Sequence, residues 1–179
     1  MEIDKSYLDF VKELKDSIVL SRYKAASTVN KEQLLLYYNT GLKLSEKIAT
    51  EKWGSSVLKR IASDLQAALP GLKGFSDRNL YNMKLFYDTY SNFSVPQSAT
   101  AKSGENKSEI SQSLTAKFDH AFFGISFTHH LLLINRCKDW EERNFYIQHT
   151  ATQFWSVSLL EQRIASHLFR HQGKLPNNF

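Results

Sequence analysis

Residues 57–90 read VLKRIASDLQAALPGLKGFSDRNLYNMKLFYDTY, and this stretch decides the fold class. Apolar residues recur at intervals of three and four on both sides of Pro70-Gly71, a pair that cannot continue a helix. The spacing predicts one helix from Val57 to Leu69 and a second helix capped by Ser76. Asp77 would lie in the first turn of that second helix, where the helix dipole favours a negative charge. The stretch therefore predicts a helix, a short turn and a helix.

The same periodicity extends over most of the chain. Only three prolines and seven glycines occur in 179 residues, which favours long helices over a turn-rich β fold. Further helices are expected at roughly 4–26, from about Asn30 (which would cap it) through Ile48, at His129–Cys137, at Trp140–Thr150 and at Val157–Phe169. Ser156 or Ser158 would cap the last of these, with Ser158 and Glu161 forming a capping box. The predicted fold class is all-α, a helical bundle of two packed subdomains with helix-turn-helix-like units.

A polar segment divides the chain into two parts. Residues 92–116 contain almost no side chains that a core could bury, and they predict a flexible polar insertion. Residues 1–91 are then expected to form an N-terminal helical, helix-turn-helix subdomain, and residues 117–179 a C-terminal helical subdomain.

Several features of the chain indicate a cytoplasmic protein that does not enter a membrane. Cys137 is the one cysteine, so the fold needs no internal disulfide and no oxidising compartment. The first residues are charged and resemble no secretory signal. No apolar run approaches the roughly 18 residues that a membrane-spanning helix needs.

The charge of the chain permits binding to nucleic acid. The formal net charge is +5, but the basic residues are spread along the sequence and form no polybasic run. A folded surface would have to gather them on one face. In a helix-turn-helix reader, polar side chains early in the second helix reach base edges, where Arg can contact guanine and Asn can contact adenine. The candidates near DNA bases are Arg78, Asn79, Asn82 and Lys84, and those near phosphates are Lys59, Arg60 and Lys73.

Two alternatives to DNA binding stay open. The helix pair could be an ordinary antiparallel pair with a solvated outer face. Alternatively, the chain could be a protein-interaction or dimerisation module without direct contact to nucleic acid. The aromatic residues Phe86, Tyr87, Tyr90 and Phe93 beside a near-neutral helix motivate that second alternative, because an exposed patch of this kind usually marks a partner surface.

Catalytic and metal-binding patterns are weak. His129 and His130 are adjacent, so on a helix they point about 100° apart and are poorly placed to share one ion. Glu13-Leu14-Lys15 matches part of a PD-(D/E)xK nuclease motif, but it falls in a strongly helical segment instead of a strand. No phosphate-binding loop, nucleophile elbow or zinc-protease motif occurs. We expect no catalytic residue, metal or cofactor in this chain.

Several strings, taken in order, carry a resemblance to a known family. They are Ile61-Ala62-Ser63-Asp64-Leu65, Gly74-Phe75-Ser76-Asp77-Arg78-Asn79-Leu80, Thr128-His129-His130, Arg143-Asn144-Phe145-Tyr146 and Trp155-Ser156. Together they resemble the N-terminal domain of the YhcG-type family of bacterial proteins. Phe127 stands where that family usually has tryptophan, which keeps an aromatic anchor.

The resemblance implies a function as well as a fold. In that family the helical domain looks like a helix-turn-helix region that precedes a C-terminal PD-(D/E)xK nuclease domain, whose catalytic positions are absent from this chain. The implied function is a DNA-binding module that targets or regulates an associated nuclease domain and is not an enzyme by itself. The expected partners are DNA, that nuclease domain and, as a possibility for a helix-turn-helix protein, a second copy of the chain.

Overall fold

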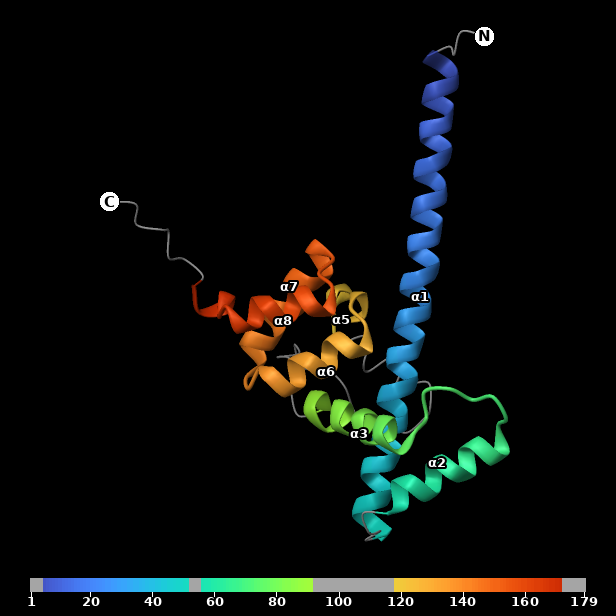
Figure 1. The fold of residues 1–179 in the computed structure, drawn as a ribbon, viewed down its shortest axis with the longest axis vertical. Coiled ribbons are helices and arrows are strands. Elements are labelled where there is room, and N and C mark those ends of the chain that lie inside the picture. Colours follow the sequence, from blue (N-terminus) through green and yellow to red (C-terminus); the bar gives the residue numbers. More distant parts are fainter. Residues whose placement is uncertain (1–4, 52–55, 92–117, 172–179) are drawn as a thin grey trace, which may run out of the picture.

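The protein is all-α throughout the residues that its computed structural model describes, which are 5–51, 56–91 and 118–171 (Figure 1). This confirms the predicted fold class. The proposed insertion at 92–116 lies outside the described residues. The elements are α1 (Lys5–Glu51), α2 (Val57–Ala68), α3 (Asp77–Ser91), α5 (His120–Gly124), α6 (Phe127–Arg136), α7 (Trp140–Gln153), α8 (Val157–Ala165) and the 3-10 helix η1 (Leu168–His171).

The prediction of two separate helices before residue 51 is wrong, because α1 runs unbroken from Lys5 to Glu51. Asn30 does not cap a helix. Its side-chain amide instead donates hydrogen bonds to the carbonyl oxygens of Phe123 (2.8 Å) and Ile125 (2.9 Å). Neither proline nor glycine occurs in the first 40 residues, so nothing in this part of the chain stops the helix. Asn30 is therefore a tertiary anchor within one long helix.

The core forms where α1 crosses α3 in close contact. Gly41 makes this crossing possible, because a Cβ atom there would lie 2.8 Å from Tyr87 Cβ and still closer to the Met83 carbonyl oxygen. Leu34 of α1 and Phe86 of α3 are among the most deeply buried residues of the core. Helix α3 thus has α1 on one side and the later helices on the other, and one core joins them all.

Aromatic rings link α3 to the later helices. The ring of Phe86 lies 6.0 Å from that of Phe122, 5.4 Å from that of Phe127 and 5.3 Å from that of His130, measured between centroids. Phe86 and Tyr90 are completely buried, and Tyr87 is half-buried. The interpretation of Phe86 and Tyr90 as an exposed partner surface is therefore wrong, because they build the core. Phe93, the fourth member of that set, lies outside the described residues.

Short polar caps begin each of the later helices. Asp119, Asp139 and Ser156 accept hydrogen bonds from backbone N–H groups in the first turns of α5, α7 and α8. Ser156, and not Ser158, is therefore the cap of α8. The predicted last helix is too long, since α8 ends at Ala165 and η1 follows after His167, whose φ is 53°. The capping box found in the structure is at Ser126, not at Ser158.

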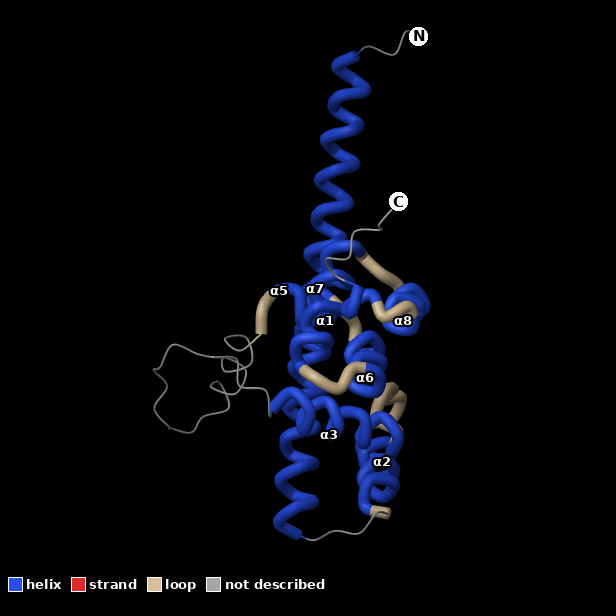
Figure 2. The backbone as a smooth tube through the Cα atoms, turned by 90° about the vertical axis from the view of Figure 1, so that its left-hand side faces the viewer, coloured by secondary structure: helices blue, strands red, loops and turns tan. Residues whose placement is uncertain are grey.

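The overall shape is a compact body from which the N-terminal half of α1 projects alone (Figures 1 and 2). Only the C-terminal half of α1 contributes buried residues, beginning at Leu34. Among the described helices, none contains a stretch that is both long enough and apolar enough to cross a membrane.

Candidate nucleic-acid interface

An open groove with a volume of about 560 Å³ lies where α2 and α3 meet the C-terminal end of α6. It brings together residues from two of the predicted classes, base-contacting and phosphate-contacting. Its lining residues are Leu58, Lys59, Asp77, Arg78, Tyr81, Asn82, Leu85 and Asn135.

The outer face of α3 supplies most of the groove. Leu80, Met83 and Phe86 turn the opposite face of α3 into the core, where each is fully buried. Arg78, Asn82 and Leu85 are spaced by four and three, so they share the other face of the helix. The same apolar periodicity that fixes α3 in the core therefore aims Arg78 and Asn82 outward.

Helix α2 forms the second wall, and it covers the core only lightly. Ala62 is its one buried residue, while Leu58, Ile61 and Leu65 pack half-buried against the core. Lys59 and Arg60 are exposed. Lys59 lines the groove, whereas Arg60 does not.

The charge in the groove is positive but small. Lys59 and Arg78 face it together with one carboxylate, that of Asp77. Within the described part of the chain, neither Lys59 nor Arg78 forms an ion pair with another side chain. Both charges are therefore able to meet an anion without first breaking an ion pair of the described residues.

Two of the predicted base-contacting residues are engaged elsewhere. Asn79 donates from its side-chain amide to the carbonyl oxygen of Gly74, and so holds the turn before α3. The ammonium group of Lys84 pairs with Asp88, which also accepts a 2.7 Å hydrogen bond from Ser45 of α1. Lys84 therefore lies beside α1, away from the groove residues. The structure brings Lys59, Arg78 and Asn82 together and leaves Asn79 and Lys84 out of the groove.

The connection between α2 and α3 holds the remaining predicted residue. It covers residues 69–76, with Gly71 and Gly74 both at a φ of 85°, a conformation that glycine adopts without steric cost. Lys73 lies between these two glycines and is exposed, but it does not line the groove. Ser76 accepts a 3.3 Å hydrogen bond from the backbone N–H of Asn79, as expected of a cap.

Sequence reasoning missed Tyr81 and Asn135. Tyr81 is 54% exposed and lies off the apolar stripe of α3, so its position outside that stripe was a usable signal. Asn135 belongs to α6, far away in the sequence, and no local pattern connects it to α3.

The adjacent histidines are built into the packing. His130 is fully buried; its Nε2–H donates to the Phe122 carbonyl oxygen at 3.0 Å, and its Nδ1 accepts from the Tyr90 hydroxyl at 2.9 Å. Burial lowers the pKa of His130 to about 3, so the ring is neutral at pH 7. Among the described residues no cluster of histidine, cysteine and carboxylate side chains could hold a metal ion.

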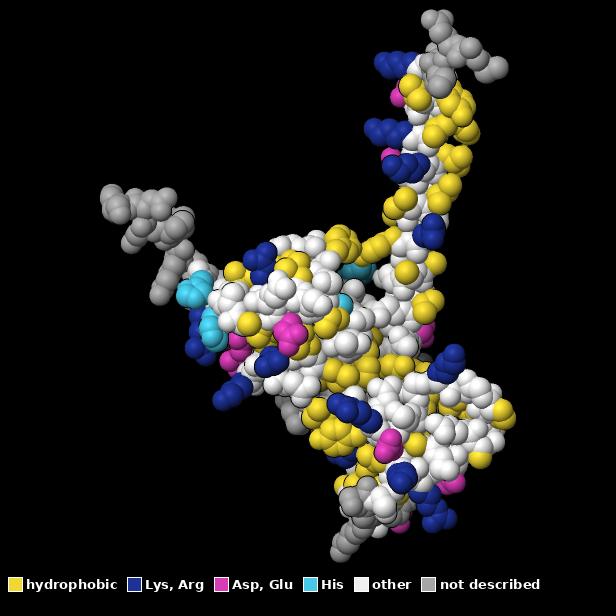
Figure 3. Space-filling model, viewed as in Figure 1, with side chains coloured by type: hydrophobic (Ala, Val, Ile, Leu, Met, Phe, Trp, Pro, Cys, Tyr) yellow, Lys and Arg dark blue, Asp and Glu magenta, His cyan; other side chains and the backbone are white. Residues whose placement is uncertain are grey.

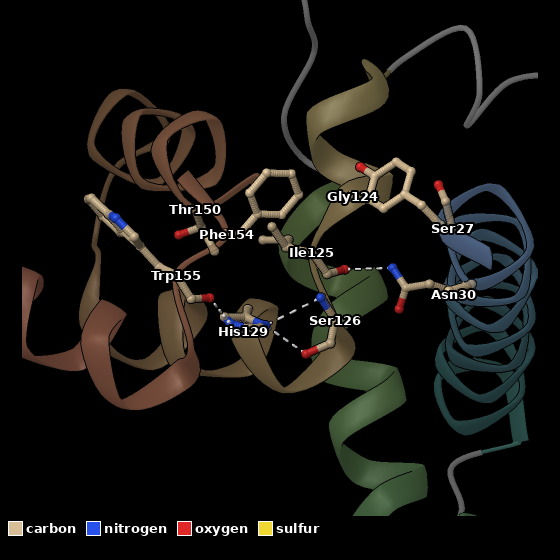
Figure 4. A pocket seen from close by; sticks show the side chains of 11 residues that line it. Ser27, Asn30, Gly124, Ile125, Ser126, His129, Thr150, Phe154 and Trp155 are labelled. Carbon is tan, nitrogen blue, oxygen red and sulfur yellow. Dashed lines mark hydrogen bonds between the residues drawn. The ribbon is translucent and has the colours of Figure 1, made fainter. Parts of the chain in front are cut away.

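His129 borders a second cavity of about 320 Å³ between α1, the α5–α6 junction and the end of α7 (Figure 4). Its Nε2–H donates to the Trp155 carbonyl oxygen at 3.0 Å, and its Nδ1 accepts from Ser126. Burial lowers the pKa of His129 as well. Both ring nitrogens are thus occupied, and Asn30 closes the same region from α1. This cavity offers no activated nucleophile.

Comparisons with known proteins agree with the resemblance drawn from the sequence. The protein described as "Putative nuclease YhcG" of Escherichia coli (strain K12) is 28% identical over 166 residues, which cover 83% of this chain and 42% of that relative. The chain therefore spans less than half the length of the curated relative that it matches. No solved structure matches it. The family model of the DUF1016 N-terminal domain matches residues 13–171, and the chain belongs to this family.

Proposed function

We propose that this chain is a DNA-binding module that directs an associated nuclease, and that the groove between α2 and α3 faces the DNA. One observation carries the proposal. Two basic residues from different helices, Lys59 and Arg78, line one open groove with the amide of Asn82. A basic, partly polar surface of this kind matches the phosphate backbone and the base edges of DNA.

The side chains of the groove suit different parts of a nucleic acid. Arg78 and Asn82 are outward on α3, and their side chains can form bidentate contacts with guanine and adenine. In this proposal Lys59 on α2 neutralises a phosphate, and the exposed Arg60 and Lys73 add phosphate contacts outside the groove. In this proposal Asn79 and Lys84 act indirectly: Asn79 holds the turn, and Lys84 with Asp88 supports the α1 side of α3.

The arrangement supports a helix-turn-helix-like role for α2 and α3. The second helix of such a unit presents its outer face to the major groove, and α3 presents Arg78 and Asn82 in this way. The connection at 69–76 is longer than the roughly three to four residues of a typical turn in that motif. We therefore propose a related geometry with a longer connection.

The relation to a nuclease comes from the relative. That protein is named a putative nuclease, and this chain matches only 42% of it. We propose that DNA cleavage belongs to the part of such proteins that this chain does not match, and that the module described here binds DNA.

Fluorescence anisotropy with random-sequence duplex DNA at several salt concentrations tests the proposal. Binding should weaken steeply with salt, and Lys59→Ala and Lys73→Ala should each lower the salt slope by about one unit. Arg78→Ala should weaken binding through the loss of its base contact. Arg170→Ala in η1 is a matched control, because Arg170 is exposed but belongs to an element remote from the groove (Figure 1). The proposal fails if the groove variants behave like this control, or if no binding occurs at low salt.

A second candidate function is that of a protein-interaction module, with a different surface from the aromatic set that the sequence suggested. The observation that favours it is the exposed apolar side of the projecting half of α1, where Phe10 is 61% exposed and Ile18 is 49% exposed.

A further inference from the structure

The projecting half of α1, residues 5–29, forms an arm. It carries large apolar side chains that the described residues leave open to solvent. They are Tyr7, Leu8, Phe10, Val11, Leu14, Ile18, Val19, Leu20, Tyr23 and Val29. Figure 3 shows hydrophobic side chains gathered along the edge of the arm that faces away from the body, with Lys and Arg mainly on the opposite edge. A helix of this kind gains most of its stability from packing its apolar face, so we expect a partner to cover the apolar face of the arm.

The body cannot cover this face because of the helical twist. At 3.6 residues per turn, Leu34 lies about 160° around the helix axis from Ile18. Leu34 is buried against the body, so the side of the arm that holds Ile18 points away from it. Tyr23, on the body side, does meet the body, since its ring lies 6.1 Å from that of Phe154.

The spacing of the outward residues indicates that the partner is another helix. Tyr7, Val11, Leu14 and Ile18 alternate steps of four and three, which is the heptad pattern of a coiled coil. Continuing the pattern gives Ser21, Ala25 and Thr28, so no charged residue enters the seam from 7 to 28. The β-branched residues Val11 and Ile18 take two of the three a positions, with Ala25 at the third, and Leu14 takes a d position. That combination favours parallel pairs of two helices.

The charges beside the seam tolerate a second copy of the same arm. In a parallel pair, each g position faces the e position of the next heptad in the other helix. This rule puts Phe10 opposite the second copy's Lys15 and Ser17 opposite the second copy's Arg22. Neither pairing sets like charges against each other. The acidic residues of the arm, Asp9, Glu13 and Asp16, lie outside the seam and its flanks.

We propose that the arm pairs with the arm of a second copy of this chain, as a parallel, in-register, two-stranded coiled coil over about residues 7–28. The hydrophobic edge of the arm faces away from α5–α8, so these helices would lie on the outside of the pair (Figure 3). The proposal does not rest on DNA binding, and its test contains no DNA. Its failure would therefore leave the groove proposal unaffected.

Sedimentation equilibrium across about 1 to 200 μM protein tests the association, because a weak dimer appears only as concentration rises. The wild-type chain should approach twice the monomer mass. Ile18→Asp puts a charge into the seam and should raise the dimer dissociation constant at least about tenfold. Leu20→Asp is the matched control: Leu20 lies on the same helix, is similarly exposed at 53%, and is off the seam. It should leave the dissociation constant within about twofold of wild type.

A cysteine cross-link tests orientation and register. Ser21 takes a d position, where the two copies of a residue face each other in a parallel pair. Ser21→Cys should therefore form a disulfide-linked dimer under mild oxidation, whereas Leu20→Cys should not. The native Cys137 is buried and should not contribute.

Three results would overturn the proposal. One is a chain that stays monomeric throughout the concentration range. Another is an Ile18→Asp variant that associates as well as Leu20→Asp. The third is a Ser21→Cys variant that cross-links no better than Leu20→Cys. If a monomeric chain instead binds vesicles of anionic lipid, the arm faces a membrane surface and the coiled-coil proposal is wrong.

Discussion

The two halves of α1 are made of similar residues in one unbroken helix, yet they have opposite relations to the rest of the molecule. The C-terminal half buries Leu34, Tyr38 and Leu44 in the core. The arm exposes Leu14, Ile18 and Leu20 to solvent. The composition of a helix therefore does not decide whether its apolar side chains reach a core. The phase of the pattern around the helix axis decides it, and that phase shifts between Ile18 and Leu34.

Truncating one apolar residue in each half gives the most direct test of this contrast. Leu34→Ala should lower the free energy of unfolding by about 3 kcal/mol, since Leu34 is 1% exposed and its loss leaves a cavity. Ile18→Ala should change it by less than about 0.5 kcal/mol, because Ile18 is 49% exposed. Urea unfolding at a protein concentration where sedimentation shows a monomer measures both. Similar losses in the two variants would contradict the contrast.

The crossing at Gly41 is the tightest contact of the C-terminal half. Gly41→Ala places a methyl group against the Met83 carbonyl, so the two helices must separate. We expect a loss of about 2 to 3 kcal/mol in unfolding free energy, despite the better helix propensity of alanine. Gly124→Ala is the control, because a Cβ there would meet Ala151 Cβ at an ordinary 3.4 Å. Equal stabilities for the two variants would show that the crossing has room to spare.

Acid should destabilise the body but not the arm, because His130 lies in the body. The pKa of His130 is about 3 in the folded protein and about 6.5 in the unfolded chain. The unfolded chain alone therefore takes up a proton between these values, and stability is lost as pH falls from about 6.5 towards 3. From pH 7.5 to 5.0 this loss is about 2 kcal/mol.

The pH dependence is measured by urea unfolding across that range. His130→Gln should be less stable at pH 7.5 but should lose less stability on acidification than the wild-type chain. His171→Gln, at an exposed position, should keep the wild-type slope. If His130→Gln also keeps that slope, another group carries the acid sensitivity.

The anchor between the two halves gives the smallest expected effect. Asn30→Ala removes both hydrogen bonds to the Phe123 and Ile125 carbonyls and should cost about 1 to 2 kcal/mol. Glu32→Ala, at an exposed position two residues away, should be nearly neutral. Calorimetric unfolding temperatures of the two variants distinguish them. An Asn30→Ala variant as stable as Glu32→Ala would mean that water replaces the lost donor.

Local chemistry made much of the fold predictable. Pro70-Gly71 and Ser76 set the boundary between α2 and α3 within a residue or so of the structure. The cap predicted at Asn30 was wrong because asparagine suits a cap as well as a tertiary hydrogen bond. Only the folded chain brings Phe123 and Ile125 to this side chain. The exposed aromatic surface predicted on α3 was wrong for a similar reason. Whether Phe86 and Tyr90 are exposed depends on α1, α5 and α6, which the sequence of α3 does not place.

The groove was predictable only in part, for the same reason. The outward positions of Arg78 and Asn82 follow from the apolar stripe of α3. The ion pair of Lys84 could have been suspected from Asp88 four residues later, but the turn role of Asn79 and the approach of Asn135 depend on tertiary contacts. Charge alone could not say which of the scattered basic residues would meet.

The unbroken course of α1 through Asn30 also has a mechanical consequence. From Asn30 to Lys5 the helix extends about 40 Å, at a rise of 1.5 Å per residue. A bend of about 10° near Asn30, where two hydrogen bonds tie α1 to the body, would move the tip by about 7 Å, which is more than one helical turn. The arm is thus a lever that pivots at the Asn30 anchor. A rotation too small to disturb the core would still reposition whatever is held at the far end.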